Sequence, residues 1–365
     1  MKAQFQKLLQ RAVQKDASDI HLKAGNVPWF RIDGEMLPQE FDVLNSEMID
    51  EIMGIMLSPD QSVHLRKRGE VDLSYTEKGV GRFRVNVYRQ RGSISCVMRR
   101  IKTVMHSFEQ LHLPETLKRF AMIQRGMILI TGTTGSGKTT TLASIVDYIN
   151  RHRRCHIVTI EDPIEYLHND HKGIVSQREI SLDTVDFSSA LKSVMRQDPD
   201  VILVGEMRDL ETFQAAISAA ETGHLVFTTL HTTNVMQTID RIIDLFPSNQ
   251  HEQIRSQLSL NLKGIMCMRL LPRADGTGRV PACEVLVVNP SARKLIKENR
   301  ILQLDGVIAS GKEAGMQSFN DSLYQLIKKG LITQETGMEV SDNPEDLNMI
   351  LQGIRLSSRQ GGILK

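Results

Sequence analysis

An apolar strand, a glycine-rich turn and an amphipathic helix follow one another directly in the first half of the chain. The strand is Met127 to Ile130, and the turn spans residues 132–139 with the sequence GTTGSGKT. The helix after it carries an apolar face formed by Leu142, Ile145, Val146 and Ile149. These two apolar periodicities predict a strand that leads straight into a helix. Such a pair is the repeating unit of a parallel sheet, whose strands need helical crossovers.

Three further apolar segments continue that alternation. They are His156 to Ile160, Val201 to Val204 and Leu225 to Thr229, and helices such as Leu210 to Glu221 lie between them. Continuous apolar strands separated by helices are typical of a parallel sheet that is covered on both faces. The sequence therefore predicts an α/β fold for this part of the chain. From about Thr233 onward it predicts mainly helices, with one more strand near 285–288.

The glycine-rich turn matches the phosphate-binding pattern G-x-x-x-x-G-K-[ST]. Its glycines let successive backbone N–H groups face the phosphates, Lys138 brings a positive charge to the β- and γ-phosphate oxygens, and the Thr139 hydroxyl is a ligand for Mg²⁺. The alternative, a glycine-rich turn without a ligand, is disfavoured by the strand before it and the helix after it. We predict that ATP binds, with Mg²⁺, at Gly132, Thr133, Thr134, Gly135, Ser136, Gly137, Lys138, Thr139 and Thr140.

A carboxylate follows the apolar strand Val201 to Val204. Ligands of open α/β sheets bind at the carboxyl ends of the strands, so Glu206 should face the same phosphate site and polarise the attacking water. Many P-loop ATPases carry an aspartate one residue earlier that assists Mg²⁺, but Gly205 stands there in this chain. Glu206 must therefore act alone or with help from elsewhere. A glutamate at a strand end is usually a solvated charge, and the P-loop upstream favours the catalytic interpretation.

Two other strands also end in polar residues. Three carboxylates lie in the segment Glu161 to Glu165, just past the strand that ends at Ile160. His224 and His231 stand at opposite ends of the strand near 225–229. A histidine in such a place is more often a hydrogen-bonded structural residue. His231 is a stronger candidate because all four strand ends are expected to meet at one phosphate site.

The N-terminal part has a different pattern. An amphipathic helix within Met1 to Ile20 precedes short strands and turn signals such as Lys78-Gly79, and Arg82 to Val87 alternates like a half-buried strand. The strand pattern stops near Ile101, and Leu113-Pro114 introduces a new helix. We predict three parts: an α+β domain over 1–100, a linker over 101–113 and the nucleotide-binding domain over 114–365.

Composition excludes several classes of protein. The chain has 365 residues, with 45 Lys+Arg against 43 Asp+Glu, so its formal charge is +2. With 41% hydrophobic and 24% charged residues it is expected to fold rather than to stay disordered. No strong positive charge favours nucleic-acid binding, and no apolar run approaches the roughly 20 residues that span a bilayer. We expect isolated thiols rather than a disulfide or zinc framework at Cys96, Cys155, Cys267 and Cys283.

Taken together, the P-loop, the acidic segment 161–165, the strand ending in Glu206 and the two histidines resemble the secretion ATPase superfamily of type II secretion and type IV pili. Within it, the chain is similar to the pilus retraction motors of the PilT/PilU type, over nearly its whole length. Residues 17–22 and 81–85 look like the PAS-like domain of that family, and 292–298 is similar to its retraction-linked A-I-R-N-L-I-R-E element. Two positions of that element depart from the family pattern, at Lys294 and Lys297.

The resemblance implies a RecA-like P-loop NTPase core after a PAS-like N-terminal domain, assembled as a homohexamer with nucleotide between protomers. Glu165 would assist at the metal together with Thr139, and His231 at the γ-phosphate. Arginines of the N-terminal domain approach the phosphates across the interface in such rings, which makes Arg82, Arg84 and Arg99 candidates. The implied location is the cytoplasm, peripheral at the inner membrane, with a pilus platform protein of that membrane as partner.

Three alternatives stay open. Residues 330–353 look more like the PilU-type paralogue, so the chain could be an accessory retraction ATPase that depends on a main motor. A RecA-like nucleic-acid translocase would need a basic strip or stacking aromatics, and aromatic residues make up only 5% of the chain. A subunit that uses nucleotide only to hold a ring together is the third. Extension motors usually carry a tetracysteine metal site, which the four unpaired cysteines do not provide.

Overall fold

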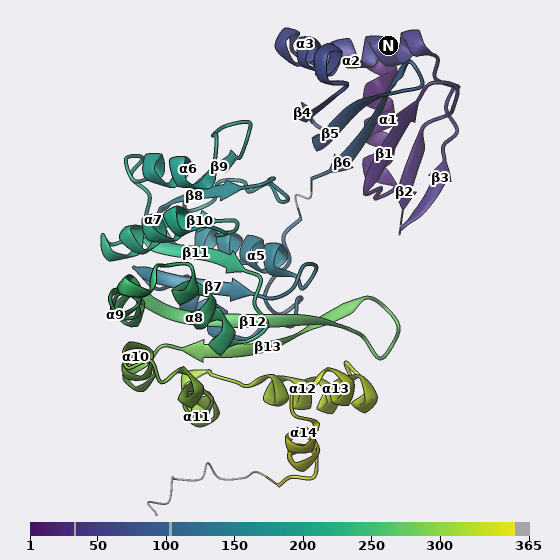
Figure 1. Cartoon of the computed structure of the whole chain (residues 1–365). Helices are drawn as coiled ribbons and strands as arrows, with labels where there is room; N and C mark the ends of the chain where they lie inside the picture. The colour runs from purple at the N-terminus through teal and green to yellow at the C-terminus, as the bar shows by residue number, and fades with distance from the viewer. Residues whose placement is uncertain (33, 102–103, 355–365) are drawn as a thin grey trace, which may run out of the picture. The chain divides into compact units, whose positions relative to one another are not determined.

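The computed structural model describes residues 1–32, 34–101 and 104–354, and the chain forms two compact units, Met1–Thr103 and Val104–Lys365 (Figure 1). The last strand of the first unit ends at Arg100, and a segment without regular structure runs from Val104 to the helix that begins at Thr116. Within the described ranges no helix has both the length and the apolar character that crossing a membrane requires. We describe each unit by itself.

The first unit is a six-stranded sheet in the order β3-β2-β1-β6-β5-β4, with every neighbouring pair antiparallel. Its helices pack on one face only, where side chains such as Phe30, Phe83 and Met98 form a single core. The elements are α1 (Lys2–Gln14), β1 (Asp19–Lys23), β2 (Trp29–Ile32), β3 (Glu35–Pro38), α2 (Ser46–Met56), α3 (Pro59–Arg68), β4 (Glu70–Glu77), β5 (Gly81–Gln90) and β6 (Ser93–Arg100).

Local sequence accounts for the ends and the orientation of these helices. In α1 the buried residues Phe5, Leu8, Leu9 and Ala12 recur at helical spacing and face the sheet. At the start of α3 the Ser58 hydroxyl accepts from the backbone N–H of Gln61, and the Gln61 side chain accepts from the backbone N–H of Ser58. Gly69 ends the helix in the left-handed conformation, at φ 85°. The unit therefore contains helices and strands in the α+β arrangement that was expected. Its PAS-like character stays a prediction.

The second unit is built on a seven-stranded sheet in the order β13-β12-β7-β11-β10-β8-β9. All neighbouring strands from β12 to β9 are parallel, and only β13 is antiparallel to its neighbour. This confirms the predicted α/β core. The strands are β7 (Gly126–Thr131), β8 (His156–Glu161), β9 (Ile174–Glu179), β10 (Val201–Val204), β11 (Leu225–Leu230), β12 (Leu262–Pro272) and β13 (Arg279–Val287).

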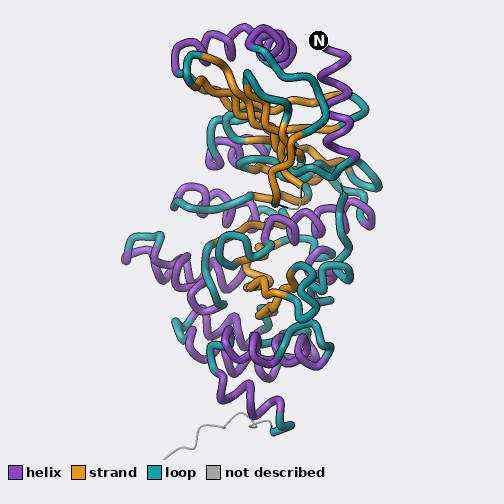
Figure 2. Tube along the Cα trace, turned by 90° about the vertical axis from the view of Figure 1, so that its right-hand side faces the viewer, coloured by secondary structure: helices purple, strands orange, loops and turns teal. Residues whose placement is uncertain are grey.

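Helices cover both faces of this sheet, as Figure 2 shows for the strands in orange and the helices in purple. Alternate residues of β7 enter different cores: Met127 and Leu129 pack with α7 to α12, whereas Ile128 and Ile130 pack with α4 and α5. The helices are α4 (Thr116–Ala121), α5 (Lys138–His152), α6 (Phe187–Val194), α7 (Leu210–Glu221), α8 (Val235–Asp244), α9 (His251–Asn261), α10 (Pro290–Lys297), α11 (Leu304–Ser310), α12 (Phe319–Lys328), α13 (Gln334–Val340) and α14 (Pro344–Leu351).

The expectation of a mainly helical region after Thr233 was wrong for residues 262–287. There β12 and β13 form a long hairpin that pairs Gly264 with Val287 at one end and Pro272 with Arg279 at the other. The expected strand near 285–288 is only the end of β13. Strand β12 starts directly where α9 ends, without a turn signal between them. Lys263, Gly264 and Arg269 interrupt its apolar residues, so neither a continuous apolar run nor a strict alternation marks it as a strand.

Candidate functional site

A cavity of about 580 Å³ lies at the carboxyl ends of the central strands of the second unit. The turn after β7, the acidic segment after β8, the residues after β10 and the end of β11 all contribute to its walls. Neighbouring parallel strands end at the same edge of a sheet, which is why residues far apart in the sequence meet here. The cavity also reaches the β12–β13 hairpin, through Leu270 and Arg279.

The glycine-rich turn forms the floor of this cavity. Gly132 has φ 151°, and a Cβ atom there would lie 2.4 Å from the Met268 carbonyl oxygen, so no larger residue fits. Gly137 adopts the left-handed conformation at φ 98° and starts helix α5. Gly132, Thr133 and Ser136 support the turn from outside the cavity lining. The predicted nucleotide-binding residues that line the cavity are Thr134, Gly135, Gly137, Lys138, Thr139 and Thr140.

The turn fits a bound polyphosphate. The Lys138 ammonium donates to the carbonyl oxygens of Gly132, at 2.8 Å, and Thr133, at 3.0 Å, and burial lowers the pKa of this amine. The Ser136 hydroxyl is buried and, among the described residues, has no hydrogen-bond partner. A positive charge held by weak carbonyl acceptors at the N-terminus of α5 favours an anion. The Thr139 hydroxyl lines the same cavity and could ligate Mg²⁺.

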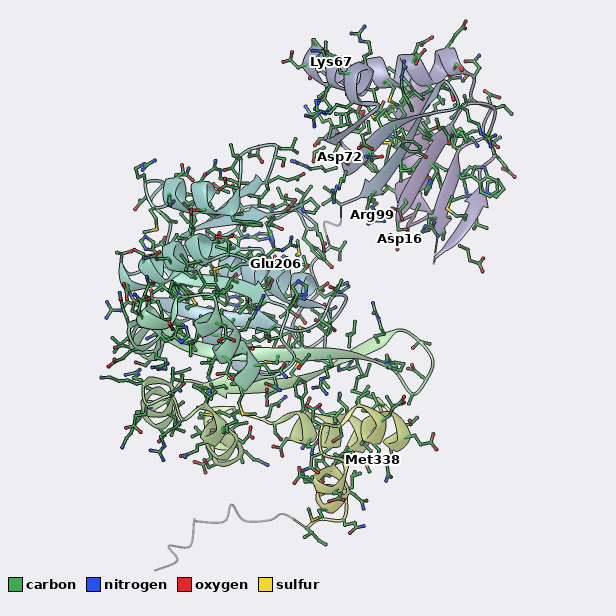
Figure 3. The ribbon with its side chains drawn as sticks, in the orientation of Figure 1. Asp16, Lys67, Asp72, Arg99, Glu206 and Met338 are labelled. Carbon is green, nitrogen blue, oxygen red and sulfur yellow. The ribbon has the colours of Figure 1, made fainter. Side chains whose placement is uncertain are left out.

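Glu206, which Figure 3 labels, has a basic side chain next to each of its carboxylate oxygens. One carboxylate oxygen is 3.1 Å from His231 Nε2, and the other accepts from Arg208 at 2.7 Å. The hydrogen bond from Arg208 lowers the pKa of the Glu206 carboxyl, and His231 and Lys138 act in the same direction. Glu206 is therefore ionised and ready to accept a hydrogen bond from water. The sequence reasoning missed Arg208, although the segment Gly205 to Asp209 offered a signal in the basic residue two positions after Glu206.

The acidic segment after β8 contains two different kinds of carboxylate. Glu161 is largely buried and accepts from the Thr159 hydroxyl, at 2.7 Å, and from Gln177, at 3.1 Å; burial raises its pKa. Glu165 is exposed and lines the cavity together with Thr139, as a metal-assisting residue must. Gly205, where many P-loop ATPases carry an aspartate, packs against the end of β8. A Cβ atom there would lie 3.2 Å from the Ile160 carbonyl oxygen, which leaves little room for a larger residue.

Two further residues complete the picture of the site. The Tyr166 hydroxyl lies 3.0 Å from the hydroxyl of Thr140, which ties the acidic segment to the first turn of α5. His224, at the opposite end of β11 from His231, contacts the Ala219 carbonyl oxygen at 2.9 Å. His224 is thus a structural residue, whereas His231 lines the cavity. The structure separates the two histidines as the strand topology requires.

The three candidate arginines lie on the face of the first unit's sheet that no helix covers. Arg82 and Arg84 alternate with the buried residues of β5, and Arg84 pairs directly across the strands with Arg99 of β6. Arg99 is bound to the buried Asp19 carboxylate at 2.8 Å, while Arg84 is exposed. Arg99 would have to leave Asp19 to contact a phosphate. Arg84 faces no such cost.

The comparison with known families decides what kind of protein carries this site. The family model described as "Type II/IV secretion system protein" matches residues 1–333. The chain belongs to the type II/IV secretion system protein family. The match supports an ATPase, and the P-loop cavity beside Glu206 is its candidate nucleotide site.

Individual members of the family are similar over almost the whole chain. The chain is 42% identical to the type IV pilus retractation ATPase PilT of Pseudomonas aeruginosa, with 93% of this chain and 98% of that protein covered. It is 41% identical to the type IV pilus ATPase PilU of the same organism, covering 96% and 91%. A crystal structure of the pilus retraction motor PilT with bound ADP superposes with a TM-score of 0.86 at 46% identity, covering 94% of this chain and 98% of that one.

Proposed function

We propose that this protein is an Mg²⁺-dependent ATPase motor that drives type IV pilus retraction, and thereby twitching motility, as a homohexamer. The observation that carries the proposal is the convergence of the P-loop, Glu206, His231 and Glu165 on one cavity. Support for the pilus function comes from the relatives, since PilT and PilU are both named for type IV pili and cover nearly the whole chain.

The residues of the cavity have different roles in ATP hydrolysis. Lys138 and the backbone N–H groups of the P-loop bind and orient the phosphates. The ionised Glu206 accepts a hydrogen bond from the attacking water and aligns it with the γ-phosphate. His231, 3.1 Å from Glu206, orients that carboxylate and reaches toward the γ-phosphate. Proximity and orientation of this kind are the main contribution a protein makes to phosphoryl transfer.

Thr139 and Glu165 are the residues that would hold Mg²⁺. Their oxygens are the hard ligands that this cation prefers, and both line the cavity next to Lys138. When bound, Mg²⁺ neutralises charge that develops on the phosphate oxygens. Glu161 is already satisfied by Thr159 and Gln177, so it is the weaker candidate for a ligand.

Arginines of a neighbouring protomer complete the site in this proposal. An arginine finger contributes about 10³ to 10⁵ in rate by stabilising charge in the transition state. Arg84 is the strongest candidate because it is exposed on the open sheet face, with Arg82 on the same face and Arg99 held by Asp19. Hydrolysis then requires the ring, and the isolated protomer should be a poor ATPase.

The proposed place of work is the cytoplasmic face of the inner membrane. There the ring would act on an integral platform protein of the pilus machine, without entering the bilayer. No nucleic acid is expected as a partner. If single-stranded DNA bound with a steep salt dependence, a translocase function would replace this proposal.

An accessory motor of the PilU type is the second candidate. The observation in its favour is that the chain is 41% identical to PilU and 42% identical to PilT, so similarity does not separate the two. Deletion of the gene distinguishes the possible roles. Hyperpiliated, non-motile cells are expected for retraction, whereas bald cells would indicate assembly. Rescue of motility by overexpressing a paralogue's gene would assign the accessory role.

Glu206→Gln tests the enzymatic part of the proposal. The variant should lose ATP hydrolysis by about 10² or more in kcat, because an amide cannot accept the water proton, while ATP still binds. Thr222→Ala is a suitable control, since Thr222 lies at the opposite end of β11 from His231 and caps α7 through the Ser218 carbonyl oxygen. Unchanged turnover in Glu206→Gln would remove that residue from its role. A wild-type protein that binds ATP without turnover would favour the non-catalytic subunit.

A further inference from the structure

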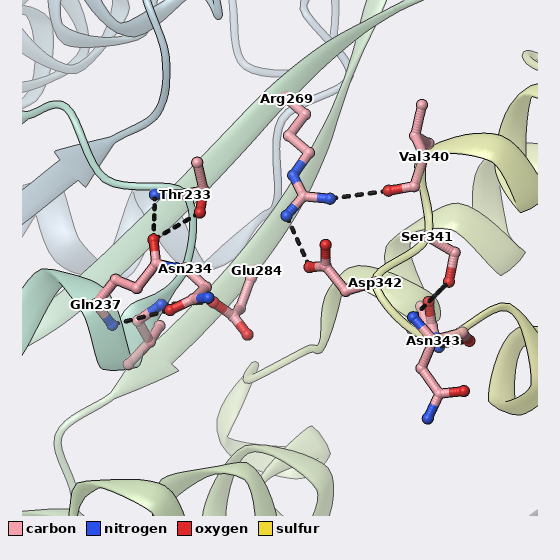
Figure 4. Close-up of polar contacts among 11 residues, drawn as sticks. Thr233, Asn234, Gln237, Arg269, Glu284, Val340, Ser341, Asp342 and Asn343 are labelled. Atoms are coloured by element: carbon pink, nitrogen blue, oxygen red, sulfur yellow. Dashed lines mark hydrogen bonds and ion pairs between the residues drawn. The ribbon is translucent and has the colours of Figure 1, made fainter.

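A buried carboxylate from β13 holds the start of helix α8 (Figure 4). The Glu284 carboxylate accepts a hydrogen bond from the backbone N–H of Val235 at 2.7 Å, across 49 residues of sequence. Val235 is the first residue of α8, and the Asn234 side chain caps the same helix by accepting from Gln237 at 2.9 Å. Two hydrogen bonds thus hold the first turn of α8: one to its N-cap residue Asn234 and one to Glu284 of the sheet.

That first turn is the direct continuation of the loop that carries His231. The Thr232 hydroxyl lies 2.7 Å from the hydroxyl of Thr238, which also donates to the Asn234 carbonyl oxygen at 2.7 Å. Thr238 in turn lies 3.5 Å from the hydroxyl of Thr131, the residue that precedes the P-loop. Three buried hydroxyls therefore join α8, the His231 loop and the phosphate-binding turn into one packed unit.

Burial of the Glu284 carboxyl group costs free energy. Burial raises its pKa to about 7, although the bond from Val235 works in the opposite direction. Asp305 and Asp342 add to the rise in the pKa, and Arg269 on β12 opposes it. The Arg269 guanidinium donates to Val340, at the end of α13, and to Asp342, in the loop before α14 (Figure 4). Burying an apolar side chain at this position would cost less free energy than burying a carboxyl group. The acid therefore indicates a function that needs its acceptor oxygen.

We propose that Glu284 is a positioning residue for ATP hydrolysis: by anchoring the first turn of α8, it keeps His231 against Glu206 at the cavity. The inference rests on the proposed ATPase function. It places in the mechanism a residue that touches neither nucleotide nor metal. Its contribution should appear in kcat, because the P-loop binds the nucleotide without it, and not in nucleotide affinity.

Glu284→Ala and Glu284→Gln form the first test. Glu284→Ala removes the acceptor and should lower kcat about tenfold or more, with KM and the Kd for ADP within twofold of wild type. Glu284→Gln keeps an oxygen acceptor of the same size and should retain at least half of the wild-type kcat. A Glu284→Ala enzyme with wild-type kcat would overturn the proposal, as would a Glu284→Gln enzyme as impaired as the alanine variant.

Ser322→Ala is the matched control. The Ser322 hydroxyl accepts from the backbone N–H of Cys283 at 3.0 Å, and both Ser322 and Glu284 are 7% exposed. Ser322 lies on α12, so its loss removes a buried acceptor that serves the same strand, β13, away from α8. The control should lower Tm without changing kcat. If Ser322→Ala reduces kcat as much as Glu284→Ala does, general destabilisation explains both and the proposal fails.

Val235→Pro removes the donor instead of the acceptor, and it decides the matter if Glu284→Ala does not fold. Proline is well tolerated at the first position of a helix, and the extended conformation of Asn234, at φ −149° and ψ 171°, suits a residue before proline. The variant should reproduce the fall in kcat. Wild-type and Glu206→Gln turnover are measured alongside: an inactive wild type contradicts the ATPase proposal, whereas an active wild type with a fully active Val235→Pro contradicts only this one.

Discussion

The two units use their sheets in opposite ways. The antiparallel sheet of the first unit is covered on one face and leaves a polar face open, with Arg82, Arg84 and Arg99 on it. The mainly parallel sheet of the second unit is covered on both faces, and the polar residues of its candidate site gather at the strand ends. In a parallel sheet the functional side chains gather at the edge where the strands end, whereas an open antiparallel face can present its charged side chains to another molecule. The comparison predicts a complete nucleotide pocket in one unit and a row of contacts in the other.

Lys138→Ala should have the largest effect, because it removes the only cation of the P-loop. We expect ATPase activity to fall about 10³-fold or more and nucleotide affinity to fall with it. Steady-state hydrolysis and fluorescent-nucleotide titration measure the two losses. Lys192→Ala is the control, since Lys192 on α6 pairs loosely with Glu211 at 3.7 Å outside the cavity. Retained binding in Lys138→Ala would contradict the idea that one unit holds a complete phosphate site.

Arg84→Ala tests the role of the open face. The variant should lose about 10² or more in kcat while each protomer still binds ADP normally, because the arginine acts from a neighbour. Arg89→Ala is the matched control: it is exposed on the same strand, but its side chain alternates to the other side. Mixing Arg84→Ala with Glu206→Gln protomers should restore part of the activity. Absence of any recovery would argue against action across an interface.

Glu284→Gln should change the pH dependence of stability. The pKa of Glu284 is about 7 in the folded protein and about 4.5 in the unfolded chain. The native protein therefore binds more protons than the unfolded chain between these pH values, and stability falls as pH rises through them. The glutamine variant lacks this loss and should gain at most about 3 kcal/mol relative to wild type above pH 7, with no gain below pH 4.5. Denaturant unfolding at several pH values measures the difference. A constant offset across pH would contradict the prediction.

Arg208→Ala should have the smallest effect. Without its hydrogen bond the pKa of Glu206 rises toward the ordinary glutamate value, which is still far below neutral pH. The acid limb of the rate profile should therefore move to higher pH, while kcat at pH 8 changes by less than about threefold. A large loss at pH 8 with an unmoved acid limb would instead give Arg208 a direct contact with the nucleotide.

The catalytic edge of the second unit could be predicted from sequence because its signals are local. The P-loop pattern spans only eight residues, and each apolar strand is followed directly in the sequence by the polar residues of the site. Strand β9 was not predicted because it is an edge strand of mixed polarity, and β12 because Lys263, Gly264 and Arg269 interrupt its apolar residues. Hydrophobic patterning therefore identified the continuously apolar strands β7, β8, β10 and β11, and only the end of β13.

The residues that sequence could not supply act through distant contacts. Arg208 looks like one more charge before a helix until the structure places it 2.7 Å from Glu206. Glu284 belongs to no motif, and only the pairing of β13 with β12 and the packing of α8 bring it to Val235. Asp19 is similar, since its burial between Arg31 and Arg99 depends on strands 12 and 80 residues away. Long-range contacts of this kind leave no periodic trace in a single sequence.

The interior place of β7 in its sheet has a consequence for how the protein opens. Strand β7 is hydrogen-bonded to β12 on one side and β11 on the other, whereas β9 and β13 are the margins. Amide hydrogens of β7 can exchange with solvent only when the middle of the sheet separates, while those of β9 need only its edge to fray. Exchange should thus be slower in the interior strands, β7 among them, than in the two margins. The phosphate-binding turn follows an interior strand, so it should stay anchored when a marginal strand frays.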